Sequence, residues 1–346
     1  MTAPPVPGRI LVIRLDRIGD VVLSTPVLDA LRRRFPHAFL AMLVRPECRD
    51  LVDGHPSLDA ILEYDKAGRH RGALGTARFA RSLRRYGFDT ALVLHPTHRS
   101  HWIPWLAGIP VRIGYRRKSP WLLTRRLPHR KQEGAQHEAA YTLELLRALG
   151  IMEAPSLPRI PVHPAAVERV EALLAPWALH GAPLVAIHPS ASGASKRWMP
   201  DRFARVADRL AAERGAQICI VAGPADAAAA AMVAAMRRPA LNLAGRLSLA
   251  ELAALLRRAA LLISNDSGPV HVAAAVGTPV VDIFGRNQAG LSRRRWGPLG
   301  PGHIVLQKDV GCVVCLADKC DIEFRCLTSL EADEVYEAAA SILSRG

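Results

Sequence analysis

The sequence of 346 residues lacks any run of roughly eighteen uncharged apolar residues, so we expect no hydrophobic membrane-spanning helix. Its start, MTAPPVPGRILVIRLDR, has neither the charged start nor the long apolar run of a secretory signal, which indicates a cytoplasmic protein. The glycine fingerprint Gly-x-Gly-x-x-Gly is absent from the first strand–turn–helix pattern, which argues against a dinucleotide. Six cysteines in a chain of this length are too few for a disulfide scaffold.

Positive charge, by contrast, is abundant and unevenly placed. The net charge is +15, of which +12 falls on residues 1–150 and only +3 on residues 151–346. The first half is therefore expected to meet an anionic partner, for which nucleic acid, an acidic membrane surface and a phosphorylated glycolipid all qualify. Solubility of an arginine-rich chain is the alternative explanation of the same excess.

Length and composition favour two domains, since half of the residues are hydrophobic and supply enough material for two cores. Apolar strand patterns alternate with helical ones, which predicts α/β domains with parallel sheets. Four prolines in residues 151–164 indicate a linker. We expect a first domain over residues 1–155, a linker over 156–164, a second domain over 165–328, and a C-terminal helix over 329–346 that returns toward the first domain.

The segment from Ile263 to Gly285, ISNDSGPVHVAAAVGTPVVDIFG, predicts a strand, a polar turn, a short helix and a second strand. Asp266 and Ser267 are of the type that caps a helix start, and we expect free backbone N–H groups over Ser267–Val270. Such a turn is suited to phosphate, and His271 lies one turn further on. An ordinary tight turn in an α/β sheet is the alternative.

Two other turns carry candidate chemistry. The small residues from Ser190 to Ser195 would let backbone N–H groups approach a phosphate, and Lys196 adds positive charge. Near the N-terminus, Asp20 ends a glycine turn at the carboxyl end of the first strand, where ligands bind in open α/β sheets. A helix cap is the plainer role for Asp20.

Residues 97–132 form the least regular part of the pattern. Three tryptophans, Trp102, Trp105 and Trp121, stand among clustered arginines and lysines. This combination suits a membrane–water boundary or nucleic acid. Because no nucleic-acid-binding motif accompanies it, we favour an anionic membrane or glycolipid and expect no nucleic acid partner; a solvated basic loop is the alternative.

Four cysteines near the C-terminus form the pattern C-x₂-C-x₄-C-x₅-C: Cys312, Cys315, Cys320 and Cys326. Four thiols at this spacing resemble a zinc or iron site, although the usual pair of C-x₂-C motifs is missing. A structural metal, free thiols and disulfides stay open as interpretations, and we assign the cluster no catalytic role.

Taken in order, these motifs resemble glycosyltransferase family 9, the heptosyltransferases of lipopolysaccharide core assembly. The resemblance rests on Gly19-Asp20-Val21, on His188 with Lys196-x-Trp198, and on Asp266-Ser267-Gly268-x-x-His271. It covers nearly the whole chain. One departure is Arg286-Asn287-Gln288-Ala289, where the family often has Pro-Thr-Asp-Pro after the last strand.

The resemblance implies a GT-B fold, two Rossmann-like parallel-sheet domains facing a central cleft. It implies inverting transfer of a heptose from ADP-heptose to an inner-core lipopolysaccharide acceptor at the inner face of the cytoplasmic membrane, with Asp20 as base and no metal in the chemistry. A protein acceptor, as in heptosyltransferases that modify autotransporters, and a non-catalytic nucleotide- or nucleic-acid-binding protein are the alternatives. The expected donor-binding residues are Ser190, Ser192, Lys196, Asp226, Leu247, Asp266, Ser267, Gly268 and His271. The expected acceptor-binding residues are Arg17, Arg116, Arg117 and Lys118.

Overall fold

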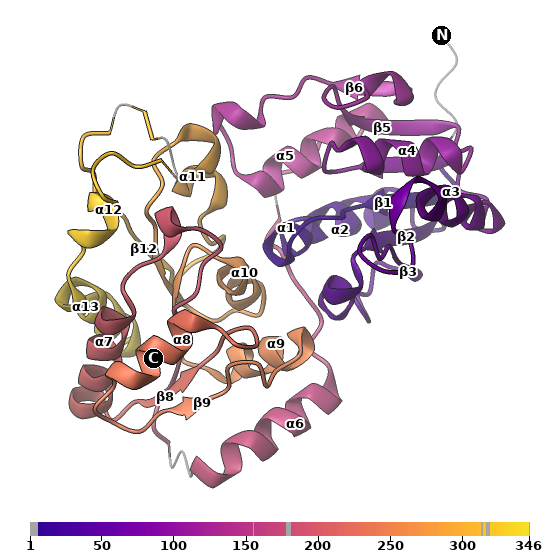
Figure 1. Cartoon of the computed structure of the whole chain (residues 1–346). Helices are drawn as coiled ribbons and strands as arrows, with labels where there is room; N and C mark the ends of the chain where they lie inside the picture. The colour runs from indigo at the N-terminus through magenta and orange to yellow at the C-terminus, as the bar shows by residue number, and fades with distance from the viewer. Residues whose placement is uncertain (1–5, 155, 178–180, 313, 316–318, 346) are drawn as a thin grey trace. The chain divides into compact units, whose positions relative to one another are not determined.

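The computed structural model describes residues 6–154, 156–177, 181–312, 314–315 and 319–345. It divides into two compact units, Met1–Pro161 and Val162–Gly346. The division after Pro161 lies inside the proline-rich segment interpreted above as a linker. Each unit is an α/β domain built on a parallel six-stranded sheet (Figure 1).

The first unit has the strand order β3-β2-β1-β4-β5-β6. The strands are β1 (Arg9–Ile13), β2 (Phe39–Val44), β3 (Ala60–Glu63), β4 (Thr90–Val93), β5 (Val111–Tyr115) and β6 (Arg125–Leu127). The α-helices are α1 (Ile18–Val22), α2 (Thr25–Arg34), α3 (Gly72–Ser82), α4 (His98–Leu106) and α5 (Glu138–Glu144). Short 3₁₀ helices are η1 (Pro46–Leu51), η2 (Leu83–Tyr86), η3 (Pro120–Leu122), η4 (Lys131–Glu133) and η5 (Leu145–Leu149).

The second unit repeats this topology, with the strand order β9-β8-β7-β10-β11-β12 when its sheet is read from the β9 edge. The strands are β7 (Leu184–His188), β8 (Gln217–Ile220), β9 (Leu241–Asn242), β10 (Leu261–Asn265), β11 (Val280–Ile283) and β12 (Ile304–Leu306). Its longer helices are α6 (Pro164–Leu174), α7 (Pro200–Arg214), α8 (Ala227–Ala235), α9 (Leu249–Arg258), α10 (Gly268–Ala275) and α13 (Ala332–Leu343). Its shorter helices are η6 (Ala175–Trp177), η7 (Ala194–Lys196), η8 (Ala289–Leu291), α11 (Arg293–Trp296) and α12 (Arg325–Thr328).

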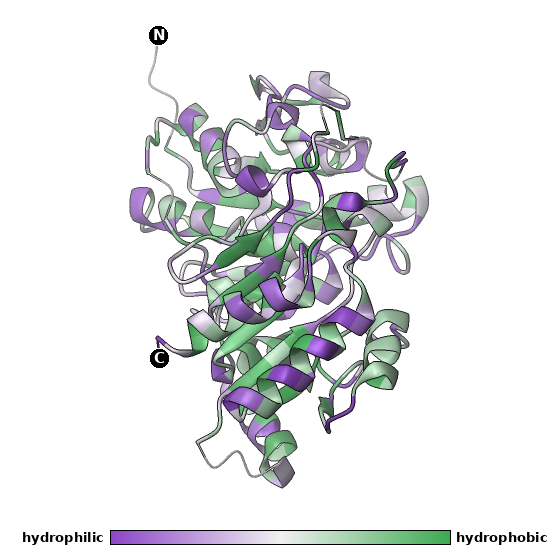
Figure 2. Ribbon diagram, turned by 90° about the vertical axis from the view of Figure 1, so that its left-hand side faces the viewer, coloured by the Kyte–Doolittle hydropathy of each residue, from purple (hydrophilic) through white to green (hydrophobic). Residues whose placement is uncertain are grey.

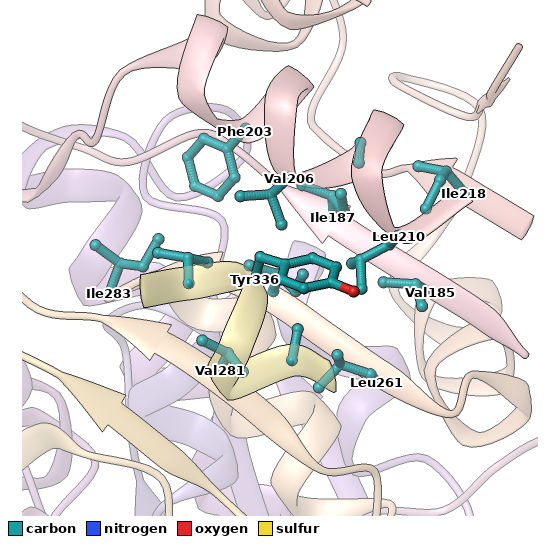
Figure 3. Close-up of a cluster of buried hydrophobic side chains, with 14 of the residues drawn as sticks. Val185, Ile187, Phe203, Val206, Leu210, Ile218, Leu261, Val281, Ile283 and Tyr336 are labelled. Carbon is teal, nitrogen blue, oxygen red and sulfur yellow. The ribbon is translucent and has the colours of Figure 1, made fainter. Parts of the chain in front are cut away.

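The central strands of both sheets are almost wholly apolar, as the green strands in Figure 2 show. Strands covered on both faces need such continuous apolar runs, because helices remove both faces from water. In the second unit, side chains of β7, β8, β10 and β11 form one core with α7 and α13. Figure 3 shows Tyr336 of α13 lying among Val185, Leu210 and Val281 in that core.

The structure defines three parts of the chain more closely than the sequence pattern does. Residues 97–132, the least regular part of that pattern, contain α4, β5 and β6 and complete the first sheet. After β1 the chain forms two consecutive helices, α1 and α2, and Pro26 lies in the first turn of α2, where its missing N–H is harmless. The C-terminal helix α13 is present and packs its apolar face in the core of the second unit, while its return toward the first domain stays a prediction.

Candidate functional site

The strand order of each sheet fixes where polar side chains gather. In the order 3-2-1-4-5-6, consecutive loops leave the first and fourth strands in opposite directions, which opens a crevice at their carboxyl ends where ligands bind. In the first unit this point lies between β1 and β4, and in the second between β7 and β10. The candidate residues of the sequence follow these strands.

At the first crevice, Arg14 follows β1 and has no exposed surface. Its guanidinium contacts three carboxylates. Nε lies 2.8 Å from Asp16, a terminal nitrogen donates to Asp20 at the start of α1, and the same nitrogen lies 3.2 Å from Glu138 of α5. A buried arginine requires such partners, since an unpaired buried charge is strongly destabilising.

Two further groups complete this cluster. Nζ of Lys131 lies 2.6 Å from Glu138, and Nδ1 of His95, just after β4, lies 2.5 Å from Asp16. Burial raises the pKa of Asp20 above its ordinary value, and the negative charge of Asp16 adds to that rise. Burial alone would also raise the pKa of Asp16, but Arg14 and His95 bring it below the ordinary value. Asp20 therefore has the higher proton affinity of these two, as a general base requires.

The expected acceptor-binding residues lie at the same edge of the first sheet. Arg17 is exposed immediately before α1, and Arg116, Arg117 and Lys118 are exposed immediately after β5, the strand beside β4. Lys118 and Ser119 both have left-handed backbone angles, with φ of 50° and 47°. Two histidines of α4 hold this turn.

Those histidines contact both strained residues. Nδ1 of His98 lies 2.7 Å from the hydroxyl of Ser119, and Nδ1 of His101 lies 2.5 Å from the carbonyl of Lys118. Left-handed conformations of residues other than glycine persist only when their surroundings hold them. The basic turn is thus held in one shape and is not a loose surface loop.

At the second crevice, one asparagine joins the two loops. Asn265, at the end of β10, accepts from the backbone N–H of Trp198 at 3.0 Å and donates to the carbonyl of Pro189 at 2.7 Å. Gly285, after β11, closes the same region, because a Cβ there would lie 2.5 Å from the carbonyl oxygen of Ser195. The loop after β7 and the turn after β10 are therefore fixed to each other.

Lys196 and Asp266, 70 positions apart in the sequence, form an ion pair across these loops, and Asp266 is buried. Asp282 of β11 lies behind this pair, since the backbone N–H of Asp266 donates to its neighbour Ile283 at 3.1 Å. Asp282 has no exposed surface, and within the described residues neither of its oxygens has a hydrogen-bond partner. Burial, with the nearby charge of Asp266, raises the pKa of Asp282 well above its ordinary value.

The start of α10 differs from its prediction in two ways. Ser267 is the N-cap residue but makes no capping bond through its side chain; its hydroxyl lies 3.1 Å from Nδ1 of His188 and 3.0 Å from Ser264. Of the four residues from Ser267 to Val270, which were expected to offer free N–H groups, two do not. Val270 donates to the carbonyl of Ser267, and Pro269 has no N–H, which leaves Ser267 and Gly268 to face a ligand. His271 is buried one turn into the helix.

The remaining donor candidates are less closely gathered. Asp226 follows β8 and caps α8 by accepting from the N–H of Ala229 at 2.9 Å. Ser190 is buried and Ser192 exposed in the loop after β7. Leu247 follows β9, the edge strand, two strands away from β7. Burial lowers the pKa of His188 to about 4, so this histidine is neutral at the floor of the crevice.

Sequence reasoning missed several members of these clusters, namely Arg14, Glu138, Lys131 as a buried partner, His95 and Asp282. Asp282 has a visible signal, because it is an acid inside the apolar strand VVDI. Arg14 is likewise a charge at the end of a buried run. Glu138 has none, since its pairing with Arg14 spans 124 positions.

The four cysteines line one cavity of about 210 Å³, which Ser195, Gly285 and Arg286 also line. All four are free thiols. Burial raises the pKa of Cys326 to about 11. Within the described residues, no three histidine, cysteine or acidic side chains are placed to hold one metal ion. In this arrangement the thiols do not form a ligand set, and the structural metal stays a prediction.

Among the described residues, no helix has the length and apolar character needed to cross a bilayer. Comparison with known families gives a match to glycosyltransferase family 9 (heptosyltransferase) over residues 76–324. Lipopolysaccharide heptosyltransferase 3 of Escherichia coli K12 is 28% identical over 77% of this chain and 79% of its own length.

Two solved structures extend the comparison. A family 9 glycosyltransferase from Veillonella parvula DSM 2008 superposes with a TM-score of 0.89 at 26% identity, covering 100% of both chains. The E. coli ADP-heptose lipopolysaccharide heptosyltransferase II superposes with a TM-score of 0.80 at 24% identity, covering 97% of this chain and 99% of its own. The expected fold class is therefore confirmed, since two Rossmann-like parallel sheets with flanking helices are the GT-B architecture.

Proposed function

The chain belongs to glycosyltransferase family 9, and on that premise we propose that it moves a heptose from an ADP-heptose donor to the inner core of lipopolysaccharide with inversion. One observation carries the choice of donor. The crevice of the second sheet gathers an ammonium group, two backbone N–H groups and a histidine, in a chain whose relatives include lipopolysaccharide heptosyltransferases. These are the groups that bind a diphosphate.

In this proposal the second unit holds the nucleotide sugar. Lys196 leaves Asp266 in part and turns to the diphosphate, while Ser267 and Gly268 donate their N–H groups to it. His271 lies in the first turns of α10 and contacts the same anion. These groups stabilise the negative charge that develops on departing ADP, which is the main contribution of preorganised donors to catalysis. Asp226, Ser190, Ser192 and Leu247 are assigned to the nucleoside.

The first unit supplies the base. Asp20 takes the proton of the acceptor hydroxyl, and that oxygen attacks the anomeric carbon from the side opposite the diphosphate. The elevated pKa of Asp20 supports this role, because a carboxylate of higher proton affinity is a better general base. No metal ion takes part in the reaction as we propose it.

The acceptor is proposed to be an anionic glycolipid, bound by Arg17, Arg116, Arg117 and Lys118 at the inner face of the cytoplasmic membrane. The tryptophans beside these cations support a membrane contact. Trp102, Trp105 and Trp121 are 40%, 44% and 66% exposed. The first two rings pack edge to face at 5.3 Å on α4, and the turn that precedes Trp121 is held by the same helix. Exposed tryptophan with arginine and lysine suits the headgroup region.

The alternatives are less well supported. Two of the relatives described above, both from E. coli, are named for lipopolysaccharide, which favours a glycolipid over a protein hydroxyl as acceptor. Membership of a glycosyltransferase family favours an enzyme over a non-catalytic binding protein.

The test is a panel of ADP-sugars and defined core acceptors, with products read by mass spectrometry. We expect one heptose to be added to an inner-core glycolipid, with release of ADP, and transfer by the Asp20→Asn variant to be about 10²–10⁴-fold slower. Transfer only to a protein, or from another nucleotide sugar only, would contradict the proposal.

A further inference from the structure

The cluster around Arg14 contains more negative than positive groups. Three carboxylates, those of Asp16, Asp20 and Glu138, contact one guanidinium, and Lys131 adds a second cation through its contact with Glu138. Leaving His95 aside, these three carboxylates and two cations give the ionised cluster a net charge of −1. One proton would make it neutral. Because the cluster is largely buried, a neutral state is favoured there more strongly than in water.

The contacts indicate which carboxylate receives that proton. Oε1 of Glu138 is shared by two cations, Arg14 at 3.2 Å and Lys131 at 2.6 Å. Asp16 contacts Nε of Arg14 at 2.8 Å and His95 at 2.5 Å. Asp20 has a single cationic partner, a guanidinium nitrogen that it shares with Glu138. Its ionised form is therefore the least stabilised of the three.

We propose that Glu138 and Lys131 are positioning residues that set the charge around Asp20, so that the cluster accepts one proton and Asp20 receives it. This inference rests on the proposed role of Asp20 as the base. Glu138 acts through Arg14: it occupies part of the guanidinium that would otherwise neutralise Asp20 completely. Lys131 limits that effect by binding Glu138 from its other side.

Other titratable groups lie near Asp20, and none of them takes over the role proposed for Glu138 and Lys131. Cys48 of η1 stays a neutral thiol, because burial raises its pKa to about 12. The charged or titratable groups that act on Asp16 and Asp20 are Arg14 after β1, His95 after β4, Glu138 of α5, its partner Lys131 of η4, and Cys48 of η1.

The test uses opposite changes of charge in the full-length protein. Glu138→Gln removes a negative charge, so the pKa of Asp20 should fall and the acid limb of kcat/KM against pH should move down by about one pH unit. Lys131→Met removes a positive charge and should move that limb up. The double variant restores the original charge and should return the limb toward wild type.

The matched control is Glu144→Gln. Glu144 lies on the same helix, six positions on, and contacts Tyr115 and Gln136 instead of Arg14. The Glu144→Gln substitution removes the same charge without touching the cluster. The acid limb of its kcat/KM profile should therefore coincide with that of the wild type. A loss of packing alone would not give shifts of opposite sign that cancel in the double variant.

A second readout does not depend on transfer. The carboxyl carbon of Asp20, assigned by its loss in Asp20→Asn, is titrated by NMR in protein labelled with ¹³C-aspartate. The same opposite shifts are expected. If they occur and no heptose is transferred, the inference stands and the proposed function fails.

If heptose is transferred but neither readout moves, or both variants shift in the same direction, the inference is overturned. Should Glu138→Gln fail to fold, Lys131→Met and the double variant still show in which direction the pKa of Asp20 shifts.

Discussion

The two units have the same strand order but treat charge at the strand ends differently. In the first, every carboxylate beside Arg14 has a cationic partner, and the excess is a single negative charge. In the second, Lys196 holds one buried carboxylate, Asp266, and Asp282 lies behind it with no hydrogen-bond partner among the described residues. The first arrangement suits the receipt of a proton, and the second keeps an ammonium group available for an incoming anion.

Substituting the proposed base should produce the largest effect and test the first half of this comparison. We expect Asp20→Asn to lower turnover by about 10²–10⁴-fold, the usual scale for loss of a general base. Affinity for the donor should stay near that of the wild type, because Asp20 belongs to the other unit. Initial rates and ADP calorimetry measure the two quantities. Full turnover in Asp20→Asn would place the base elsewhere.

Removal of the Lys196 ammonium group tests the second half of the comparison, the anion site of the second unit. Lys196→Ala and His271→Ala should each weaken ADP binding by roughly 10–100-fold, since hydrogen bonds to charged groups contribute about 1.5–3 kcal/mol. Calorimetry with ADP measures this, and Lys308→Ala is the control, because Lys308 pairs with Glu334 of α13 instead of a residue assigned to the donor. Unchanged ADP affinity in both variants would remove the donor site from this crevice.

Charge reversal in the basic turn tests whether the first unit binds the acceptor while the second binds the donor. Arg116, Arg117 and Lys118, each changed to Glu, should raise the apparent KM for the acceptor several-fold and reduce binding to anionic vesicles. Added salt should imitate this, because exposed charges more than about 8 Å apart are largely screened at physiological ionic strength. Donor affinity should not move. Intact acceptor kinetics and vesicle binding would make the turn a merely solvated surface.

Asp282 offers a smaller effect, on stability. Its pKa is raised in the folded protein, so folding favours its protonated form, and this contribution is lost as pH rises above the ordinary carboxyl range. Asp282→Asn removes the titration. We expect its thermal midpoint to exceed that of the wild type by roughly 2–4 °C at pH 8, for about 1 kcal/mol, with less difference at pH 5. Equal midpoints at both pH values would mean that Asp282 has a partner in solution.

The smallest expected effect on transfer concerns the cysteines. If they hold a structural metal, the purified protein should contain about one zinc or iron per chain by elemental analysis, and a chelator should lower its thermal midpoint. Transfer rates at low temperature should change little, since the proposed chemistry uses no metal. Absence of metal in protein purified without chelators, with four titratable thiols, would favour free thiols.

The sequence predicted the fold well where one physical signal dominated. Buried strands such as β1 and β10 are continuous apolar runs, and the local pattern Ser-x-x-Glu at Ser248 and Glu251 forms the capping box of α9. The apolar pattern of the sequence did not predict strands β5 and β6. An edge strand needs no apolar face, and β6, Arg-Arg-Leu, is short and charged, as edge strands often are.

The candidate site was predictable only in part. Lys196 and Asp266 follow strands in turns of recognisable composition, and the structure joins them. Arg14 with Glu138, and His95 with Asp16, are tertiary pairs whose members lie far apart in the chain. No local pattern encodes such a pair. The roles of all these residues in binding and transfer stay predictions until they are measured.

The repeated strand order also has a consequence for synthesis on the ribosome. All six strands of the first sheet, and the helix α5 that completes the Arg14 cluster, precede Pro161, and no strand is exchanged between the units. The first unit can therefore finish folding while the second is still being translated, as domains generally do. Within it, β1 must wait for β4, some 80 residues later, before its second edge is covered. A nascent chain released before that point would expose an apolar strand edge to its neighbours.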